Sequence, residues 1–197
     1  EIITHTAELL WEHKTIRHFQ GSIGVSGMTQ GNATSGRYFI PNFRNYSTGL
    51  FLIERWTRNK LEIEAGVRFD YKWQRVFLFE GTTLTKPEFN YRNLSGMAGL
   101  IYHIKPDWKL NAHAGTAWRP PGVNELYSDG VHHGAASYEK GDAGLGMEKA
   151  TNFIASISRD KNKKLNGEVS IYYTLFNGFI YLSPQQPPVL TIRGAFP

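Results

Sequence analysis

The feature that most constrains this sequence is one long stretch of strict alternation. Over positions 61–74 every odd position holds an apolar or aromatic residue, and every even position holds a polar residue or glycine. Such period-2 alternation is typical of a β-strand with one apolar face and one polar face. Strands in globular proteins usually run for about five or six residues. A strand of this length favours a wall that crosses a lipid bilayer.

The other predicted strands and their connections indicate the same architecture. We predict eight strands, at residues 5–12, 17–29, 47–57, 60–74, 91–104, 108–118, 150–159 and 165–182. Tight turns alternate with long loops: the turns lie near 12–16, 58–59, 105–107 and 160–164, and the loops at 30–46, 75–90 and 119–149. Outer-membrane β-barrels sort their connections in this way, with the short turns facing the periplasm. The sequence therefore predicts an all-β, antiparallel up-and-down meander that forms part of a transmembrane β-barrel.

Composition narrows the function classes. No run of about 18 apolar residues is present, so a transmembrane helix is excluded, while the mean hydropathy of −0.39 is compatible with a barrel because only alternate residues face lipid. The absence of cysteine excludes disulfides and thiolate metal sites. The net charge of +5 is spread along the chain rather than concentrated in an arm. We therefore expect no nucleic-acid partner.

Aromatic residues should concentrate at the two membrane interfaces of a barrel. Three of them, Trp11, Trp56 and Trp108, lie beside the predicted short turns, and three others lie toward the long loops: Trp73, Trp118 and Tyr181. This sorting favours a pair of interfacial girdles. The alternative is the core of a soluble β-sandwich that serves as a binding or adhesion module.

The loop at 119–149 carries the most specific pattern. It contains Arg-Pro-Pro at 119–121, Glu-Leu-Tyr-Ser-Asp-Gly-Val-His-His-Gly at 125–134 and Tyr-Glu-Lys-Gly-Asp at 138–142. Together with Glu-Ala-Gly-Val-Arg-Phe-Asp at 64–70, this pattern resembles the barrel of TonB-dependent outer-membrane receptors. The resemblance covers nearly the whole chain.

The resemblance implies that residues 1–197 are a partial barrel domain, without the plug domain, of a larger bacterial outer-membrane receptor. A barrel of this family has about twenty-two strands. The family resemblance further implies TonB-dependent uptake of a scarce nutrient, such as a siderophore, haem or a metal ion. The expected partners are this ligand, the lipid of the outer membrane and, through the plug of the intact protein, TonB. We expect no cofactor and no catalytic residue. An outer-membrane barrel enzyme stays an alternative, although neither a GxSxG nor an HExxH motif is present.

The same loop holds the candidate site. Adjacent imidazoles at His132 and His133 can ligate a metal ion or haem iron, and carboxylates at Glu125 and Asp129 lie near them in sequence. We predict these four residues as ligand-binding, with the two histidines as candidate metal ligands. The alternative is a solvated pair of histidines that packs the loop. The prolines that follow Arg119 must end the strand at this residue. Arg119 could then form an ion pair with Glu125 and brace the loop.

Overall fold

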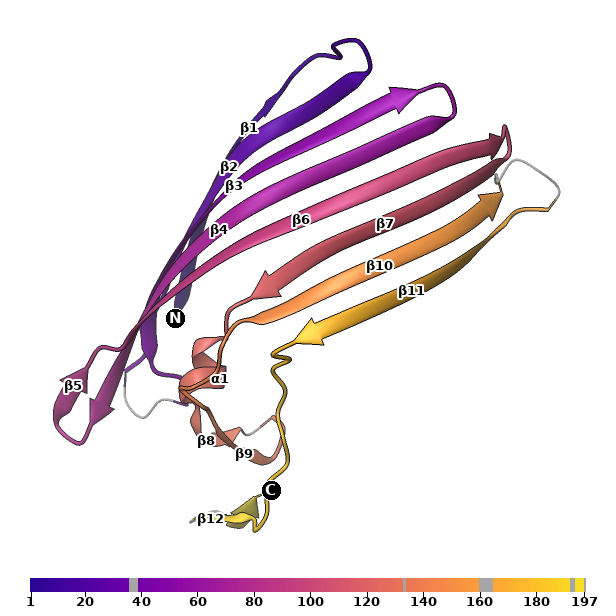
Figure 1. Cartoon of the computed structure of the whole chain (residues 1–197). Helices are drawn as coiled ribbons and strands as arrows, with labels where there is room; N and C mark the ends of the chain where they lie inside the picture. Colours follow the sequence, from indigo (N-terminus) through magenta and orange to yellow (C-terminus); the bar gives the residue numbers. More distant parts are fainter. Residues whose placement is uncertain (36–38, 133, 160–164, 192–193, 197) are drawn as a thin grey trace.

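The structure, a computed structural model, describes residues 1–197 except 36–38, 133, 160–164, 192–193 and 197, and except the side chain of residue 80. Its long strands form one curved antiparallel sheet in the order β1-β2-β3-β4-β6-β7-β10-β11 (Figure 1). Their bounds are Ile2–Glu12, Phe19–Asn32, Asn42–Arg58, Leu61–Glu80, Glu88–Lys105, Trp108–Arg119, Glu148–Arg159 and Gly167–Asn177. Each strand pairs with its predecessor among them, so the predicted meander of eight strands is confirmed.

The remaining elements are short and lie at the end of the sheet that carries the long connections (Figure 1). They are β5 (Thr83–Thr85), α1 (Val123–Tyr127), β8 (Asp129–His132), β9 (Ser137–Lys140), β12 (Val189–Thr191) and β13 (Gly194–Phe196). Among the described residues, no helix is long and apolar enough to span a membrane. The described long strands belong to a single sheet rather than two sheets packed face to face, so the β-sandwich alternative is wrong.

The predicted loop at 75–90 is wrong, because most of this segment is strand. β4 continues to Glu80, where it pairs with β5, and β6 already begins at Glu88, opposite Arg75. The chain first turns at Gly81, which has a φ of +65°. Apolar residues continue through positions 76–79, so nothing before that glycine interrupts the strand pattern. The loop at 30–46 shortens in the same way, since β2 and β3 pair up to Asn32 and Phe43.

The last predicted strand, at 165–182, is too long. β11 ends at Asn177, and Gly178 follows with a φ of +66°. The backbone N–H of Ile180 then donates to the Glu148 carboxylate at 2.8 Å. The ladder between β10 and β11 ends at the pair Lys149 and Asn177, so Tyr181 lies beyond the strand rather than at its end.

Register assigns the two faces of the sheet. The alternating residues of β4 place Arg68, Asp70 and Lys72 on the inside of the curve, where one hollow is bordered by residues of every long strand from β1 to β7. The apolar series, including Val67 and Phe69, faces outward. Register also divides the apolar run at 50–53, whose even positions face outward and whose odd positions face inward. The even positions of β4 thus line the inside, as a barrel lumen requires.

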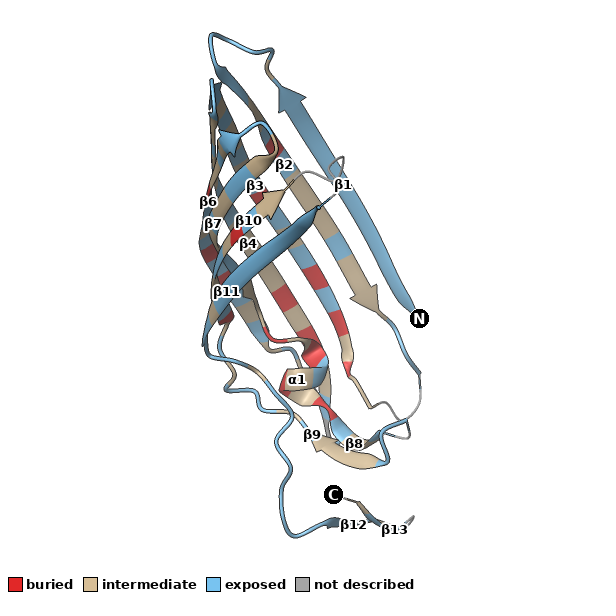
Figure 2. Cartoon of the chain, turned by 90° about the vertical axis from the view of Figure 1, so that its right-hand side faces the viewer, coloured by how far each residue is buried: buried red, intermediate tan, exposed pale blue. Residues whose placement is uncertain are grey.

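Burial is concentrated where α1 packs against the inner face of the sheet (Figure 2). Val123 of α1 joins Phe43 and Val76 in a small apolar core, and Leu126 is 1% exposed. Elsewhere the strands keep exposed apolar side chains, such as Leu50 on β3. A soluble protein would cover these residues, whereas the wall of a membrane barrel presents them to lipid.

Candidate functional site

The loop after β7 begins with a bracing ion pair. Pro120 and Pro121 end the strand, and α1 starts at once with Val123. Arg119 Nη1 donates to the Glu125 oxygens Oε1 and Oε2 at 2.9 and 2.8 Å. The predicted pairing of Arg119 with Glu125 is therefore confirmed.

A second carboxylate extends this pair into a network of four chain segments. Arg119 Nη2 donates to Glu148 Oε2 at 3.2 Å, and the same oxygen accepts the N–H of Ile180 at 2.8 Å. The end of β7, the start of β10 and the segment after β11 are thereby tied to α1. Sequence reasoning missed Glu148 and Ile180, because they are far from Arg119 along the chain.

The pKa of Glu125 reflects opposing effects. Partial burial raises the pKa of this carboxyl, but hydrogen bonds from Arg119 and from the Gly122 backbone, with the charge of Arg119, hold it below its ordinary value. The Gly122 N–H donates to Glu125 Oε2 at 2.7 Å and so satisfies a free amide at the start of α1. Glu125 therefore acts on the position of the loop.

The hairpin β8–β9 carries the other described candidates. His132 Nδ1 lies 2.6 Å from Glu139 Oε1, and its ring stacks on Phe39 with 5.5 Å between centroids. Asp129 accepts a hydrogen bond from the Tyr138 hydroxyl at 2.6 Å. His133 lies outside the described residues.

The described part of the chain contains no group of three or more histidine and carboxylate side chains placed to hold a metal ion. Glu125, Asp129 and His132 therefore do not form such a group by themselves, and each is bonded to a different partner.

The hollow on the inner face was not predicted as a site. It has a volume of about 750 Å³ and is bordered mainly by polar and charged side chains, among them Glu8, Ser26, Arg68, Asp70, Lys72, Ser95, Trp118 and Arg119. Alternation along β4 predicted that Arg68, Asp70 and Lys72 share one face. It could not show which other strands border the same hollow.

Asp70 organises the charged part of this hollow. It accepts Arg68 Nε at 2.7 Å through Oδ1 and the Trp118 indole N–H at 3.2 Å through Oδ2. Arg68 Nη2 also donates to Ser26 at 2.8 Å. The bond to Asp70 draws the Trp118 indole toward the inner face of the sheet. The prediction that Trp118 belongs to the interfacial girdle near the long loops is therefore wrong. The ladder between β6 and β7 stops at Gly115, whereas the ladder between β7 and β10 continues to Arg119.

Several polar groups beneath α1 are buried without a hydrogen-bond partner among the described residues. Gln74 is fully buried with both amide atoms unpaired, and the same holds for Oδ1 of Asn45 and the hydroxyl of Tyr91. Each such group costs about 1–3 kcal/mol. This cost offsets part of the stabilisation that the apolar packing of α1 provides.

Comparison with known proteins identifies the family. Residues 7–193 match the model of the TonB dependent receptor-like β-barrel. Comparison with curated protein sequences gives no significant match.

Solved structures show the same fold at low sequence identity. The copper transporter OprC is 16% identical over 90% of this chain and 31% of its own, with a TM-score of 0.71. The Serratia marcescens hemophore receptor HasR, solved with HasA and heme, is 15% identical over 90% of this chain and 33% of its own, with a TM-score of 0.68. The alcaligin outer-membrane receptor FauA from Bordetella pertussis is 14% identical over 92% of this chain and 30% of its own, with a TM-score of 0.62.

The chain thus spans about a third of the length of these proteins. The family is one of receptors and transporters rather than enzymes. Because the family model matches almost the whole sequence, and because the open, curved meander has the fold of these barrels, the chain belongs to the TonB-dependent receptor β-barrel family of the bacterial outer membrane.

Proposed function

We propose that this chain forms part of the wall and extracellular mouth of a receptor that takes up a scarce nutrient by a TonB-dependent mechanism. The observation that carries the proposal is the family match over residues 7–193. The polar inner face and the inward-folded loop after β7 support it, since a lumen needs both a wettable wall and a shaped entrance.

The proposed domain organisation is one section of a closed barrel of about twenty-two strands. The edge strands β1 and β11 each pair on one side only in the described structure. Their apolar side chains are widely exposed, as at Leu9 (71%) and Ile171 (72%). Unpaired edges of this length invite further strand pairing, which closure within a larger barrel would satisfy. In this organisation a plug domain and its contact with TonB belong to the intact protein.

The proposed nutrient is a metal ion, a metal chelate or haem. OprC is named for copper, HasR was solved with heme, and FauA is named for alcaligin. The hairpin β8–β9 supports this choice by its chemistry. A histidine that ligates a metal usually gives its second ring nitrogen to a carboxylate. His132 has this arrangement with Glu139, and its Nε2 has no hydrogen-bond partner among the described residues.

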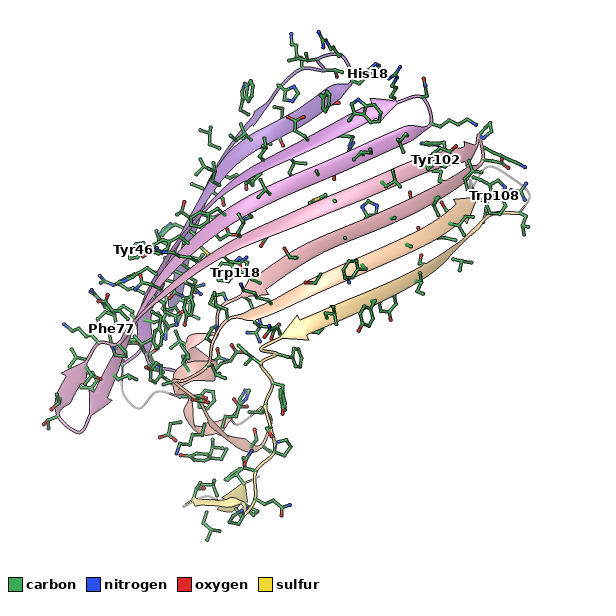
Figure 3. The ribbon with its side chains drawn as sticks, in the orientation of Figure 1. His18, Tyr46, Phe77, Tyr102, Trp108 and Trp118 are labelled. Atoms are coloured by element: carbon green, nitrogen blue, oxygen red, sulfur yellow. The ribbon has the colours of Figure 1, made fainter. Side chains whose placement is uncertain are left out.

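We therefore propose His132 and His133 as ligand contacts, with Asp129 at the base of the same hairpin and Glu125 holding the loop that presents them. Changing His132→Ala in the intact receptor should weaken ligand binding about 10-fold or more. The matched control His18→Ala removes an exposed histidine from the opposite end of the sheet (Figure 3) and should leave the Kd unchanged. Equal affinities for His132→Ala and the unaltered receptor would contradict the assignment of the contact.

Uptake by whole cells tests the function itself. Cells that lack the chromosomal receptor but carry the intact gene should accumulate one of three labelled nutrients: free copper, haem or a ferric siderophore. Removal of TonB should reduce this uptake to the level of cells without the receptor. Uptake that persists without TonB would refute the mechanism.

A further inference from the structure

The outward face of the sheet carries an apolar groove close to the short turns. Its volume is about 670 Å³, and four alanines form its floor: Ala98, Ala112, Ala114 and Ala155. Larger side chains border it, among them Ile63, Leu100, Phe153, Ile171 and Tyr173. The groove arises because alanines on neighbouring strands lie next to one another, with bulky side chains on either side of them.

Strand register places these residues on the membrane-facing side. Ala112 pairs with Leu100 on one side and with Ala155 on the other, and Leu100 pairs in turn with Ile63. Ile63 belongs to the outward apolar series of β4. Residues directly opposite each other in a sheet project to the same face, so the groove opens toward the lipid rather than the lumen.

Positive charge lies at the turn end of the same strands. Lys60 lies in the turn between β3 and β4, Lys105 is the last residue of β6, and Lys60 Nζ donates to the Ile104 carbonyl of β6 at 3.4 Å. Neither lysine forms an ion pair with a described residue. The carboxylates nearest to them in sequence, Asp107 and Glu62, are engaged by Arg159 at 3.2 Å and by His103 at 3.1 Å.

The spacing of these two features suits one amphipathic molecule. Tyr102 and Trp108 lie at the turn end of β6 and β7, where interfacial aromatics are expected (Figure 3). From Ala112 to Trp108 the strand runs for about 13 Å at about 3.3 Å per residue. An apolar tail in the groove would therefore place its polar head beside Lys60 and Lys105.

We propose that this surface binds an anionic phospholipid of the periplasmic leaflet, with an acyl chain in the alanine groove and the phosphate at Lys60 and Lys105. The short turns mark the periplasmic side, and the groove lies at membrane depth, so its surroundings are lipid. Charge complementarity selects an anionic headgroup, because cations near a membrane surface attract acidic lipids by about 1 kcal/mol each.

Spin-labelled lipids test this proposal in the intact receptor reconstituted into phosphatidylcholine vesicles. The association constant of labelled phosphatidylglycerol, relative to labelled phosphatidylcholine, should fall about fivefold for each of Lys60→Gln and Lys105→Gln. Lys60→Arg and Lys105→Arg should retain the preference. Arg92→Gln, which removes a cation at the opposite end of β6, is the matched control and should have no effect.

A second pair of variants tests the groove. Ala112→Phe and Ala155→Phe fill it and should reduce the immobilised fraction of both lipids, whereas Thr48→Phe on the outer face of β3 should not. Retained gel mobility of the folded barrel shows that each variant has assembled. Equal association of both lipids with the unaltered receptor, or a preference that both lysine variants retain, would overturn the proposal.

Discussion

At the scale of single residues, Arg119 and its two carboxylates decide where the long loop lies. The guanidinium contacts Glu125 on α1 and Glu148 on β10. The Arg119 side chain is 42% exposed, so each ion pair stabilises the folded loop by at most about 1 kcal/mol. The network therefore keeps the loop in place without making it rigid.

Removing one acceptor should loosen α1. Glu125→Gln loses the charge that Arg119 and the Gly122 amide share, so backbone amides of 123–128 should exchange with deuterium up to about fivefold faster, as about 1 kcal/mol implies. Glu139→Gln, which alters contacts to His132 and Ser137 within the hairpin, is the control. Unchanged exchange in Glu125→Gln would show that apolar packing alone holds α1.

The same carboxyl makes loop docking sensitive to pH. Since the pKa of Glu125 is lower in the folded loop than its ordinary value of 4.5, its contribution is fully present above about pH 4.5 and is lost as pH falls through the lowered pKa. Amide protection factors of 123–128, measured between neutral pH and about pH 3, should decrease over that acidic range. Glu125→Gln should abolish this part of the decrease. An equal decrease in the variant would contradict the assignment to Glu125.

Gly141 sets how closely β9 approaches α1. A Cβ on Gly141 would lie 2.5 Å from both the Tyr127 nitrogen and the Leu126 carbonyl carbon, whereas a Cβ on Gly146 would meet nothing within 4 Å. Gly141→Ala should therefore destabilise the docked loop by about 1–3 kcal/mol, and Gly146→Ala should not. Limited proteolysis of the loop measures the difference. Equal cleavage of the two variants would contradict this packing.

At the scale of elements, alternation predicted the strands well and their ends poorly. The period-2 pattern of β4 depends only on neighbouring residues, so it could be read along the chain. The end of β11 depends on the distant Glu148, which captures the N–H of Ile180. Trp118 likewise turns toward Asp70 on β4, two strands away in the sheet.

The candidate site was predictable to a similar extent. The pairing of Arg119 with Glu125 spans six residues, and proline chemistry indicated where the loop begins. Alternation could not reveal the hollow beside Asp70, because six strands contribute to its border. The partners of His132 also depend on how the hairpin folds.

Adjacent residues of β11 test the assignment of faces. Ile171 lies outward and Ser170 inward, so Ile171→Arg should destabilise the intact barrel by about 2–4 kcal/mol. Ser170→Arg should stay within about 0.5 kcal/mol. The urea midpoint of the intact receptor in lipid reports the difference. A larger loss for Ser170→Arg would reverse the two faces.

At the scale of the whole molecule, the sorted connections give the chain a direction. The short turns lie together at one end of the curved sheet, and the loop with α1, β8 and β9 lies at the other (Figure 1). In the proposed orientation, the hairpin with His132 faces the arriving nutrient, and Lys60 and Lys105 lie at the periplasmic leaflet. Both proposals therefore depend on the orientation of the chain in the membrane.

Cysteine labelling of intact cells tests this orientation most directly, because the chain has no cysteine of its own. Ala143 in the long loop and Thr15 in the first turn are both exposed. In the intact receptor, a membrane-impermeant maleimide should label Ala143→Cys on whole cells and label Thr15→Cys only after the outer membrane has been permeabilised. Labelling of Thr15→Cys on whole cells, with Ala143→Cys protected, would contradict the account.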